Sequence, residues 1–191
     1  LSDGLSGHPG EAAAGLRLAQ ILSAFAKQGA GPTQRFPELS PEHQRRLLER
    51  YHDPEPRVAL GAADAAEGVA SAAIDVSDGV GIDAGRVARA SGVRLVLEAD
   101  RLPLSGALRS FAAMSDQNAL ELALGGGDDY ELLFTVPEER EEALERAALE
   151  RGLPVTRIGT VEAGAGAVLR SPSGERDVAG LGHDHLQERA G

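Results

Sequence analysis

Residues 71–98 have the sequence SAAIDVSDGVGIDAGRVARASGVRLVLE, which indicates a strand, a helix and a second strand in succession. Residues 71–76 are mostly small or apolar, as expected of a short buried strand. Residues 79–91 have the composition of a helix, and Gly92 follows as its C-terminal cap. Residues 93–98 alternate apolar and polar side chains, as a half-buried strand does. This order is typical of a domain in which helices pack on a sheet.

The segments on either side continue the alternation of helices and strands. Ser40 is placed as an N-cap and Pro41 at the first helical position, a common helix start. We expect helices over residues 11–27, 41–51, 58–69, 79–91, 104–124 (as one helix or two) and 137–151, and strands over 71–76, 93–98, 130–136, 155–161 and 167–171. The predicted fold class is α+β, a layered α/β/α domain with a mixed sheet.

Composition narrows the classes of function. The chain has 191 residues, 42% of them hydrophobic, which suffices for one domain with its own core. A net charge of −11 argues against nucleic acid and against an anionic membrane surface as partners, because both require a basic face. The absence of cysteine excludes disulfides and thiolate metal sites, and it fits a cytoplasmic protein. No apolar run is long enough to span a bilayer, and the first residues do not form a signal peptide.

The first candidate site is AIDVSDG at residues 73–79, where a strand ends and a helix begins. The turn can bring Asp75 and Asp78 together at the edge of the sheet, with the Ser77 hydroxyl beside them. Such oxygen ligands suit Mg2+, which commonly shares its coordination with substrate phosphates, and the helix N-terminus favours phosphate. A helix cap formed by Ser77 or Asp78 explains the same residues, and from spacing alone it is the favoured interpretation.

The second candidate site is GGGDDYE at residues 125–131. The glycines permit close approach of the backbone to a ligand, and the clustered carboxylates of Asp128, Asp129 and Glu131 call for a cation or a donor-rich ligand. Alternation along the following strand places Phe134 on an all-apolar core face and Glu131 on the more accessible face. An exposed acidic loop also explains the pattern, so both interpretations stay open.

The third candidate site is DPEPRV at residues 53–58. Its prolines stiffen the entry into the next helix, and Arg57 is placed to pair with a phosphate or a carboxylate. A surface ion pair or cap is the favoured interpretation, because exposed pairs are common and contribute little. Near the C-terminus, His183 and His185 flank Asp184, and we interpret this segment as a polar tail rather than a metal site. The sequence contains no nucleophile elbow, Walker loop or kinase glycine-rich loop.

Together these segments resemble one enzyme family. Its members are the thiamine-monophosphate kinases, which show matching segments in the same order: RY at 50–51, PEPRV at 54–58, AIDVSDG at 73–79, ASGV at 90–93, LPLS at 102–105 and GGDDYELLFT at 126–135. Related ATP-using enzymes, such as aminoimidazole ribonucleotide synthetase and selenophosphate synthetase, share the Ser-Asp-Gly segment. The GGDDYELLFT stretch is much more specific to the thiamine-phosphate enzymes, so it decides between them. The resemblance implies a domain like the C-terminal domain of aminoimidazole ribonucleotide synthetase.

The resemblance also implies an activity and a set of site residues. The family transfers the γ-phosphoryl group of ATP to thiamine monophosphate, giving thiamine diphosphate and ADP, with several Mg2+ ions bound to the polyphosphate. Asp75 and Asp78 match metal ligands of the family, and Ser77 matches a residue that contacts ATP. Glu131 matches a residue that binds the thiamine moiety, and His183 stands where the family usually has an aromatic that packs on the substrate. The further candidates are Asp128, Asp129 and Arg57.

The resemblance further implies that this site is incomplete. The family has an N-terminal domain with more metal-binding aspartates, ATP contacts and much of a dimer interface, and residues 1–15 match the start of its C-terminal domain. The chain has no initiator methionine. We therefore expect residues 1–191 to be the single C-terminal domain of a two-domain, homodimeric, cytoplasmic kinase, with residues 183–191 as a flexible tail. We expect this chain to be inactive by itself.

Two other hypotheses stay open at this stage. The chain can belong to a different ATP-using enzyme of the same superfamily, although the Asp-Tyr-Glu stretch argues against this. It can also be a non-catalytic domain that retains the fold, but the intact clusters of carboxylates argue against a module freed from metal binding.

Overall fold

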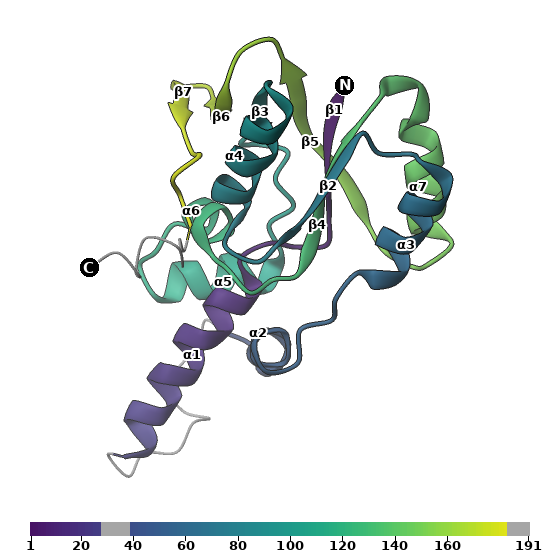
Figure 1. The fold of residues 1–191 in the computed structure, drawn as a ribbon. Coiled ribbons are helices and arrows are strands. Elements are labelled where there is room, and N and C mark those ends of the chain that lie inside the picture. Colours follow the sequence, from purple (N-terminus) through teal and green to yellow (C-terminus); the bar gives the residue numbers. More distant parts are fainter. Residues whose placement is uncertain (28–38, 183–191) are drawn as a thin grey trace, which may run out of the picture.

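A computed structural model describes residues 1–27 and 39–182 of the chain (Figure 1). Its strands form one sheet in the order β2-β4-β1-β5-β3-β6-β7. The strands are β1 (Ser2–Ser6), β2 (Ala72–Val76), β3 (Arg94–Glu98), β4 (Glu131–Val136), β5 (Val155–Glu162), β6 (Gly166–Ser171) and β7 (Gly174–Asp177). Strands β3 and β6 pair in parallel and the other neighbours are antiparallel, so the sheet is mixed, as predicted.

The helices lie close to the predicted ranges. They are α1 (Glu11–Ala26), α2 (Pro41–His52), α3 (Val58–Glu67), α4 (Val80–Ser91), α5 (Gly106–Met114), α6 (Ala119–Gly125) and α7 (Glu141–Leu149), with a 3-10 turn, η2, at Glu138–Arg140. Two predicted caps are confirmed. The Ser40 Oγ accepts a hydrogen bond from the His43 amide at 3.2 Å, and Gly92 ends α4 in the left-handed conformation with φ of 65°.

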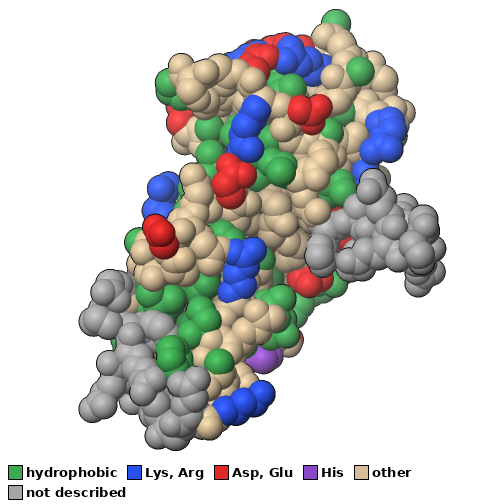
Figure 2. Space-filling model, turned by 90° about the vertical axis from the view of Figure 1, so that its left-hand side faces the viewer, with side chains coloured by type: hydrophobic (Ala, Val, Ile, Leu, Met, Phe, Trp, Pro, Cys, Tyr) green, Lys and Arg blue, Asp and Glu red, His purple; other side chains and the backbone are tan. Residues whose placement is uncertain are grey.

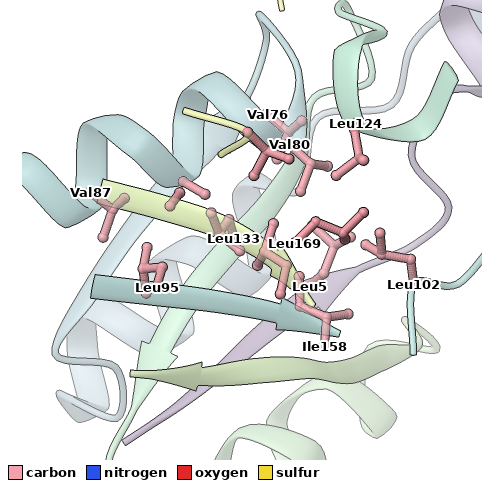
Figure 3. Close-up of a cluster of buried hydrophobic side chains, with 14 of the residues drawn as sticks. Leu5, Val76, Val80, Val87, Leu95, Leu102, Leu124, Leu133, Ile158 and Leu169 are labelled. Atoms are coloured by element: carbon pink, nitrogen blue, oxygen red, sulfur yellow. The ribbon is translucent and has the colours of Figure 1, made fainter. Parts of the chain in front are cut away.

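The main core lies between α4 and one face of the sheet (Figure 3). Val80 and Val87 of α4 pack with strand residues such as Leu5, Leu133 and Leu169, and all of them are buried. Each such side chain contributes roughly 1.5–3 kcal/mol by leaving water. This apolar layer fixes the end of β2 and the start of α4, which carry the first candidate site.

Two further clusters complete the layers. On the other face of the sheet, Phe134 of β4 packs with Leu60 of α3 and Leu144 of α7. Beside the sheet, α1, α2, α5 and α6 share a core around residues such as Leu18 and Phe111. Figure 1 shows α1 extending away from the sheet, with α2 across its base. Helices therefore cover both faces, which confirms the predicted layered α/β/α architecture.

Strands β1 and β7 were absent from the sequence prediction. Strand β1 is central and pairs with both β4 and β5, although its residues Ser2, Asp3 and Gly4 have low strand propensity. Burial between two neighbouring strands overrides that propensity, because all five residues of β1 are buried. Strand β7 pairs only with β6 at one edge of the sheet, and its four residues are exposed, so it has no apolar pattern to detect.

The predicted flexible tail at residues 183–191, including His183, lies outside the described residues. Among the helices that the structure describes, none is long and apolar enough to cross a membrane. Figure 2 shows acidic and basic side chains scattered over one face of the molecule rather than gathered into a single basic surface.

Candidate functional site

Three loops converge at one end of the sheet. Strands β1 and β2 both run antiparallel to β4, so their C-terminal ends lie beside the start of β4. The loops after β1 and β2 therefore meet the glycine-rich loop before β4. The first and second candidate sites, which lie some fifty residues apart in the sequence, become neighbours in the fold.

Backbone hydrogen bonds join the two candidate loops directly. The Asp128 amide donates to the Ser77 carbonyl oxygen at 2.8 Å, and the Tyr130 amide donates to the Val76 carbonyl oxygen at 2.9 Å. Gly127 makes this approach possible, because a Cβ at that position would lie 2.6 Å from the Ser77 carbonyl oxygen. The glycine run thus allows the backbones of the two loops to lie in close contact.

The Asp75–Gly79 turn carries two carboxylates in different surroundings. Asp75 lies on the edge strand β2 and is exposed, whereas Asp78 is 8% exposed and pairs with the Arg86 guanidinium at 2.5 Å. The favoured interpretation of this turn as a cap is not supported, since Asp83 takes that role. Its Oδ2 accepts hydrogen bonds from the Asp78 and Gly79 amides at 3.1 Å and 3.2 Å. Asp75 and Asp78 are therefore not needed to cap α4.

The three carboxylates of the acidic loop point to three different places. Asp128 is exposed, while Asp129 and Glu131 are 0% and 1% exposed. The prediction that Glu131 lies on the more accessible face of β4 is wrong. Alternation along β4 was interpreted correctly, but helices cover both faces of this strand, so neither face is open to water.

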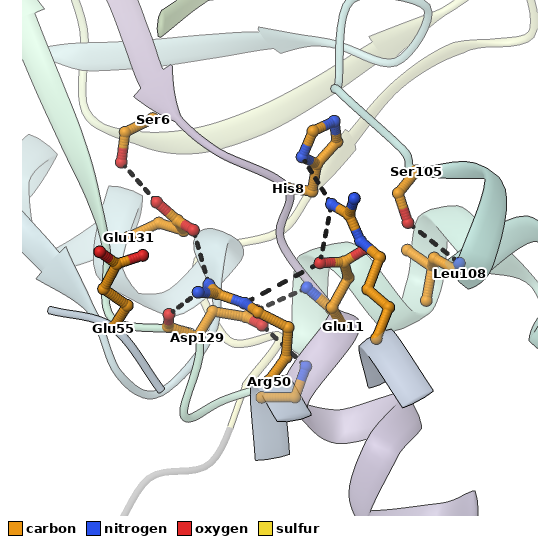
Figure 4. A network of polar contacts seen from close by, with 12 residues as sticks. Ser6, His8, Glu11, Arg50, Glu55, Ser105, Leu108, Asp129 and Glu131 are labelled. Atoms are coloured by element: carbon orange, nitrogen blue, oxygen red, sulfur yellow. Dashed lines mark hydrogen bonds and ion pairs between the residues drawn. The ribbon is translucent and has the colours of Figure 1, made fainter. Parts of the chain in front are cut away.

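Glu131 sits in a buried ion-pair network (Figure 4). Its carboxylate accepts hydrogen bonds from Ser6 Oγ at 2.7 Å, Arg50 Nη2 at 2.6 Å, and Arg57 Nε and Nη2 at 2.8 Å and 2.9 Å. Burial acts to raise the pKa of Glu131, but the bonds from Arg57 and Ser6 outweigh it, and the pKa lies below its usual value. Arg57 thus pairs with a buried carboxylate as well as with the exposed Glu55, so the favoured interpretation of a surface pair describes only part of its contacts.

The same network extends to the start of α1. Arg46 donates to the Glu11 carboxylate at 2.6 Å and 3.2 Å, and its Nη2 lies 3.3 Å from His8 Nδ1. The pKa of His8 is lowered, mainly by burial, which favours the neutral imidazole. The neutral ring accepts a hydrogen bond from Arg46 at Nδ1. Sequence reasoning missed Arg46, Arg50 and Glu11. The arginines at helical spacing on α2 were the available signal, but their partners come from distant segments.

Asp129 is buried against the first turn of α1. Its Oδ2 accepts a hydrogen bond from the Gly10 amide at 2.5 Å and its Oδ1 accepts one from the Ala12 amide at 3.0 Å. Burial raises the pKa of Asp129 to about 7, although the two amide bonds oppose the shift. Asp129 therefore caps α1 from a distant part of the chain, a role that its local sequence does not reveal.

A cavity of about 540 Å³ opens beside these loops. Its lining includes Ser77, Asp128, the Gly125–Gly127 run, Ala12 and Arg17 of α1, and Glu121 of α6. Of the predicted site residues, Ser77 and Asp128 face this cavity. Asp75, Asp78, Asp129, Glu131 and Arg57 are not among the described residues that line it. The structure thus brings the ATP-contacting candidate and one carboxylate of the acidic loop to the same hollow.

The donor chemistry of the Asp75–Gly79 turn fits a hard cation such as Mg2+. Two carboxylates with a neighbouring hydroxyl are oxygen ligands of the kind that this ion takes together with substrate phosphates. The Arg86 guanidinium on Asp78 shows that a positive charge is already favourable at this point. Within residues 1–27 and 39–182, no group of three or more His, Asp or Glu side chains is arranged to hold a metal.

The fold and the converging loops define the class of protein. A family model described as "AIR synthase related protein, C-terminal domain" matches residues 19–171, and the chain belongs to this family. Within it, the chain is similar to thiamine-monophosphate kinases, as the sequence motifs predicted. It is 38% identical over 159 residues to the thiamine-monophosphate kinase of Salmonella typhimurium, a match covering 83% of this chain and 44% of the relative.

Solved structures give the same relationship. The crystal structure of thiamine-monophosphate kinase from Stenotrophomonas maltophilia K279a superposes with a TM-score of 0.72 at 38% identity, covering 88% of this chain and 49% of that chain. A structure described as "AaThiL complexed with AMPPCP and TMP" superposes with a TM-score of 0.69 at 32% identity, covering 88% and 47%. The chain therefore spans about half the length of the relatives that it matches.

Proposed function

We propose that the chain is the C-terminal part of a thiamine-monophosphate kinase, which transfers the γ-phosphoryl group of ATP to thiamine monophosphate. The observation that carries this proposal is the cavity that Ser77 and Asp128 line together, in a chain 38% identical to such kinases. The structure described with AMPPCP and TMP supports the same pair of ligands for this chain.

The reaction needs little covalent work from the protein. The bond from the γ-phosphorus to its bridging oxygen breaks, a phosphate oxygen of thiamine monophosphate bonds to that phosphorus, and ADP leaves. Alignment of the two phosphates and neutralisation of their charge supply the catalysis. Bound Mg2+ neutralises charge on the polyphosphate. We assign Asp75 and Asp78 to holding Mg2+, and the Ser77 hydroxyl to donating a hydrogen bond to ATP.

We assign the direct contact with the thiamine moiety to Asp128 rather than to Glu131. Thiamine carries a cationic thiazolium ring and an amino group, so an exposed carboxylate at the cavity wall complements it. Glu131 is 1% exposed, and Arg50, Arg57 and Ser6 occupy its oxygen atoms. The role of His183 as a substrate-packing residue remains a prediction.

The site is composite in this proposal. The described residues offer fewer than three clustered metal ligands, and the matched relatives are about twice as long as this chain. We infer that the remaining ligands come from an N-terminal domain, that the complete enzyme is a cytoplasmic homodimer, and that this chain alone does not transfer phosphate.

Calorimetric titration of the chain with thiamine monophosphate, in the presence of Mg2+ and AMPPCP, tests the ligand assignment. Asp128→Asn is expected to weaken binding about tenfold, the loss of one charge-assisted contact. Asp100→Asn, an exposed aspartate outside the cavity, is the matched control and should bind like the parent. Equal affinity of the parent and Asp128→Asn would contradict the assignment, and preference for another phosphorylated substrate would indicate a different enzyme of the family.

Activity is tested with the chain joined to the N-terminal half of the Salmonella typhimurium relative. This fusion is expected to form thiamine diphosphate from ATP and thiamine monophosphate, while the chain alone forms none. Product formation by the chain alone would overturn the composite site. A folded fusion without activity would count against the proposed reaction.

A further inference from the structure

Two non-glycine residues of the acidic loop hold a left-handed backbone. Asp128 has φ of 65° and Tyr130 has φ of 52°, in a region that residues with a Cβ seldom adopt. Such conformations persist only where the surroundings impose them, and they cluster at sites that bind or react. Asp129 lies between these two residues, so its contacts bear directly on how the turn is held.

The carboxylate and the carbonyl oxygen of Asp129 are engaged within the protein. Its carboxylate accepts from the Gly10 and Ala12 amides, and its carbonyl oxygen accepts from Arg50 Nη2 at 3.0 Å. The residue is fully buried, so a ligand in the cavity has no access to it. The contacts join three elements: the glycine-rich loop, the start of α1 and the last turn of α2.

The partners of Asp129 matter because they belong to the cavity. Ala12 lines the cavity and donates its amide to Asp129, and Asp128 lines the same cavity and is the covalent neighbour of Asp129. The place of the Asp128 carboxylate relative to α1 is therefore set through Asp129. A change that leaves the Asp128 side chain intact can still misplace it by releasing this connection.

We propose that Asp129 is a positioning residue: it holds the turn at residues 128–130 against the first turn of α1, and so fixes Asp128 at the cavity wall without touching the ligand. The identity of the ligand rests on the proposed function, but the positioning itself does not. Glu131, two residues further on, adds a second point of attachment through Arg50 and Arg57. Asp128 thus faces the ligand cavity, whereas Asp129 and Glu131 are buried in the protein interior.

Hydrogen exchange measured by NMR on this chain tests the positioning. The Tyr130 amide donates to the carbonyl oxygen of Val76 at the end of β2, and the Asp128 amide donates to that of Ser77 in the following turn. Both bonds depend on the shape of the turn at residues 128–130. Asp129→Asn keeps the size of the side chain but cannot accept from both amides. It is expected to speed exchange at Asp128 and Tyr130 at least tenfold, with little change at core amides of β4 such as Phe134.

Two control variants separate positioning from general loss of stability. Asp64→Asn alters another buried aspartate, which lies on α3, outside the cavity lining. The Asp64 carboxylate accepts a hydrogen bond from the Ala70 amide at 2.7 Å. This variant should speed exchange broadly, without selecting the turn. Asp128→Asn should weaken binding of thiamine monophosphate but leave the Tyr130 amide protected. Asp129→Asn should weaken that binding about tenfold, and its effect on exchange should be confined to the turn.

Two results would overturn the proposal: unchanged exchange at Asp128 and Tyr130 in Asp129→Asn, or faster exchange spread evenly over the core. If the fusion with the N-terminal half of the relative neither binds thiamine monophosphate nor forms product, the proposed function fails while the exchange data still decide the positioning. If Asp129→Asn does not fold, the parent chain gives the answer. The Gly10 and Ala12 amide shifts must then follow the titration of Asp129, and shifts insensitive to pH would refute the contact.

Discussion

Arg57 donates two hydrogen bonds to Glu131, from Nε to Oε2 at 2.8 Å and from Nη2 to Oε1 at 2.9 Å. The two side chains are 10% and 1% exposed, so the pair is nearly removed from water. A planar guanidinium that meets a carboxylate with two parallel bonds gives both strength and a fixed orientation. The pair attaches the segment before α3 to the first residue of β4.

Glu131→Gln should destabilise the chain strongly. The substitution removes the buried counter-charge that Arg50 and Arg57 share, and leaves Arg50 with Glu11 at 3.9 Å and Arg57 with the exposed Glu55. Loss of one partner from a buried pair costs about 3–5 kcal/mol. Urea unfolding followed by circular dichroism measures the change. Arg45→Gln breaks the exposed Arg45–Glu49 pair on α2 and should cost no more than about 0.5 kcal/mol. Equal losses in the two variants would contradict the assigned burial.

The same pair predicts a dependence on acid. The pKa of Glu131 is lower in the folded chain than its usual value, so its contribution to stability is present at neutral pH and is lost as pH falls through the lowered pKa. Below pH 4 the parent should therefore lose more of its free energy of unfolding than Glu131→Gln does. Parallel stability curves for the two proteins would show that Glu131 keeps an ordinary pKa.

Asp3 should destabilise the chain at neutral pH. It lies in the central strand β1, fully buried, and its two carboxylate oxygens have no hydrogen-bond partner among the described residues. Burial raises its pKa to about 7, against smaller opposing effects of the N-terminal ammonium group and of Arg157. The unfolded chain releases this proton near pH 4 and the folded chain near pH 7, so stability falls as pH rises through this interval.

Asp3→Asn removes this titration while keeping the shape of the side chain. At pH 8 the variant should be more stable than the parent by up to about 4 kcal/mol, and at pH 4 the two should be nearly equal. Thermal unfolding at a series of pH values measures the difference. A gap that stays constant with pH would show that Asp3 does not titrate in this interval.

Two glycines within helices should respond in opposite directions to alanine. Gly15 of α1 faces α2, and a Cβ there would overlap the Leu47 carbonyl oxygen and lie 2.8 Å from Tyr51 Cβ. Gly15→Ala should therefore cost about 1–3 kcal/mol by forcing the two helices apart. Gly61 of α3 has only Leu132 Cδ1 nearby, at 3.6 Å, so Gly61→Ala should stabilise by about 0.5–1 kcal/mol.

Chemical denaturation of both glycine variants tests this contrast. Because the two substitutions make the same chemical change in helix interiors, the difference in sign isolates the contact between α1 and α2. Stabilisation by both would mean that the helices can separate without cost at this point.

Removal of divalent cations should abolish the effect of nucleotide on stability. If Asp75 and Asp78 hold Mg2+ with the phosphates, AMPPCP should raise the melting temperature of the chain with Mg2+ and not with EDTA. Asp78→Asn should lose this rise, and Asp100→Asn should keep it. A rise that survives EDTA would place the nucleotide phosphates on protein groups alone.

The sequence was sufficient for elements whose pattern is local. Helix α4 carries its own start and its own glycine end, and the β2–α4 turn was placed correctly for that reason. Strand β1 was invisible because its strand conformation comes from pairing with β4 and β5 rather than from its own residues. The acidic loop was singled out as a candidate site, but its three carboxylates could not be assigned to separate roles. Their partners come from β1, α1 and α2, and local sequence carries no record of those contacts.

The central place of β1 has a consequence during synthesis. Among the strands of this sheet β1 is made first, and its two neighbours, β4 and β5, are made more than a hundred residues later. Until then its amide and carbonyl groups stay open, as they would on the edge of an unfinished sheet. A strand rich in valine or isoleucine would pair with other nascent chains during that interval, whereas Ser-Asp-Gly-Leu-Ser has little tendency to do so. We therefore expect the residues that make β1 hard to predict from sequence also to limit aggregation of the growing chain.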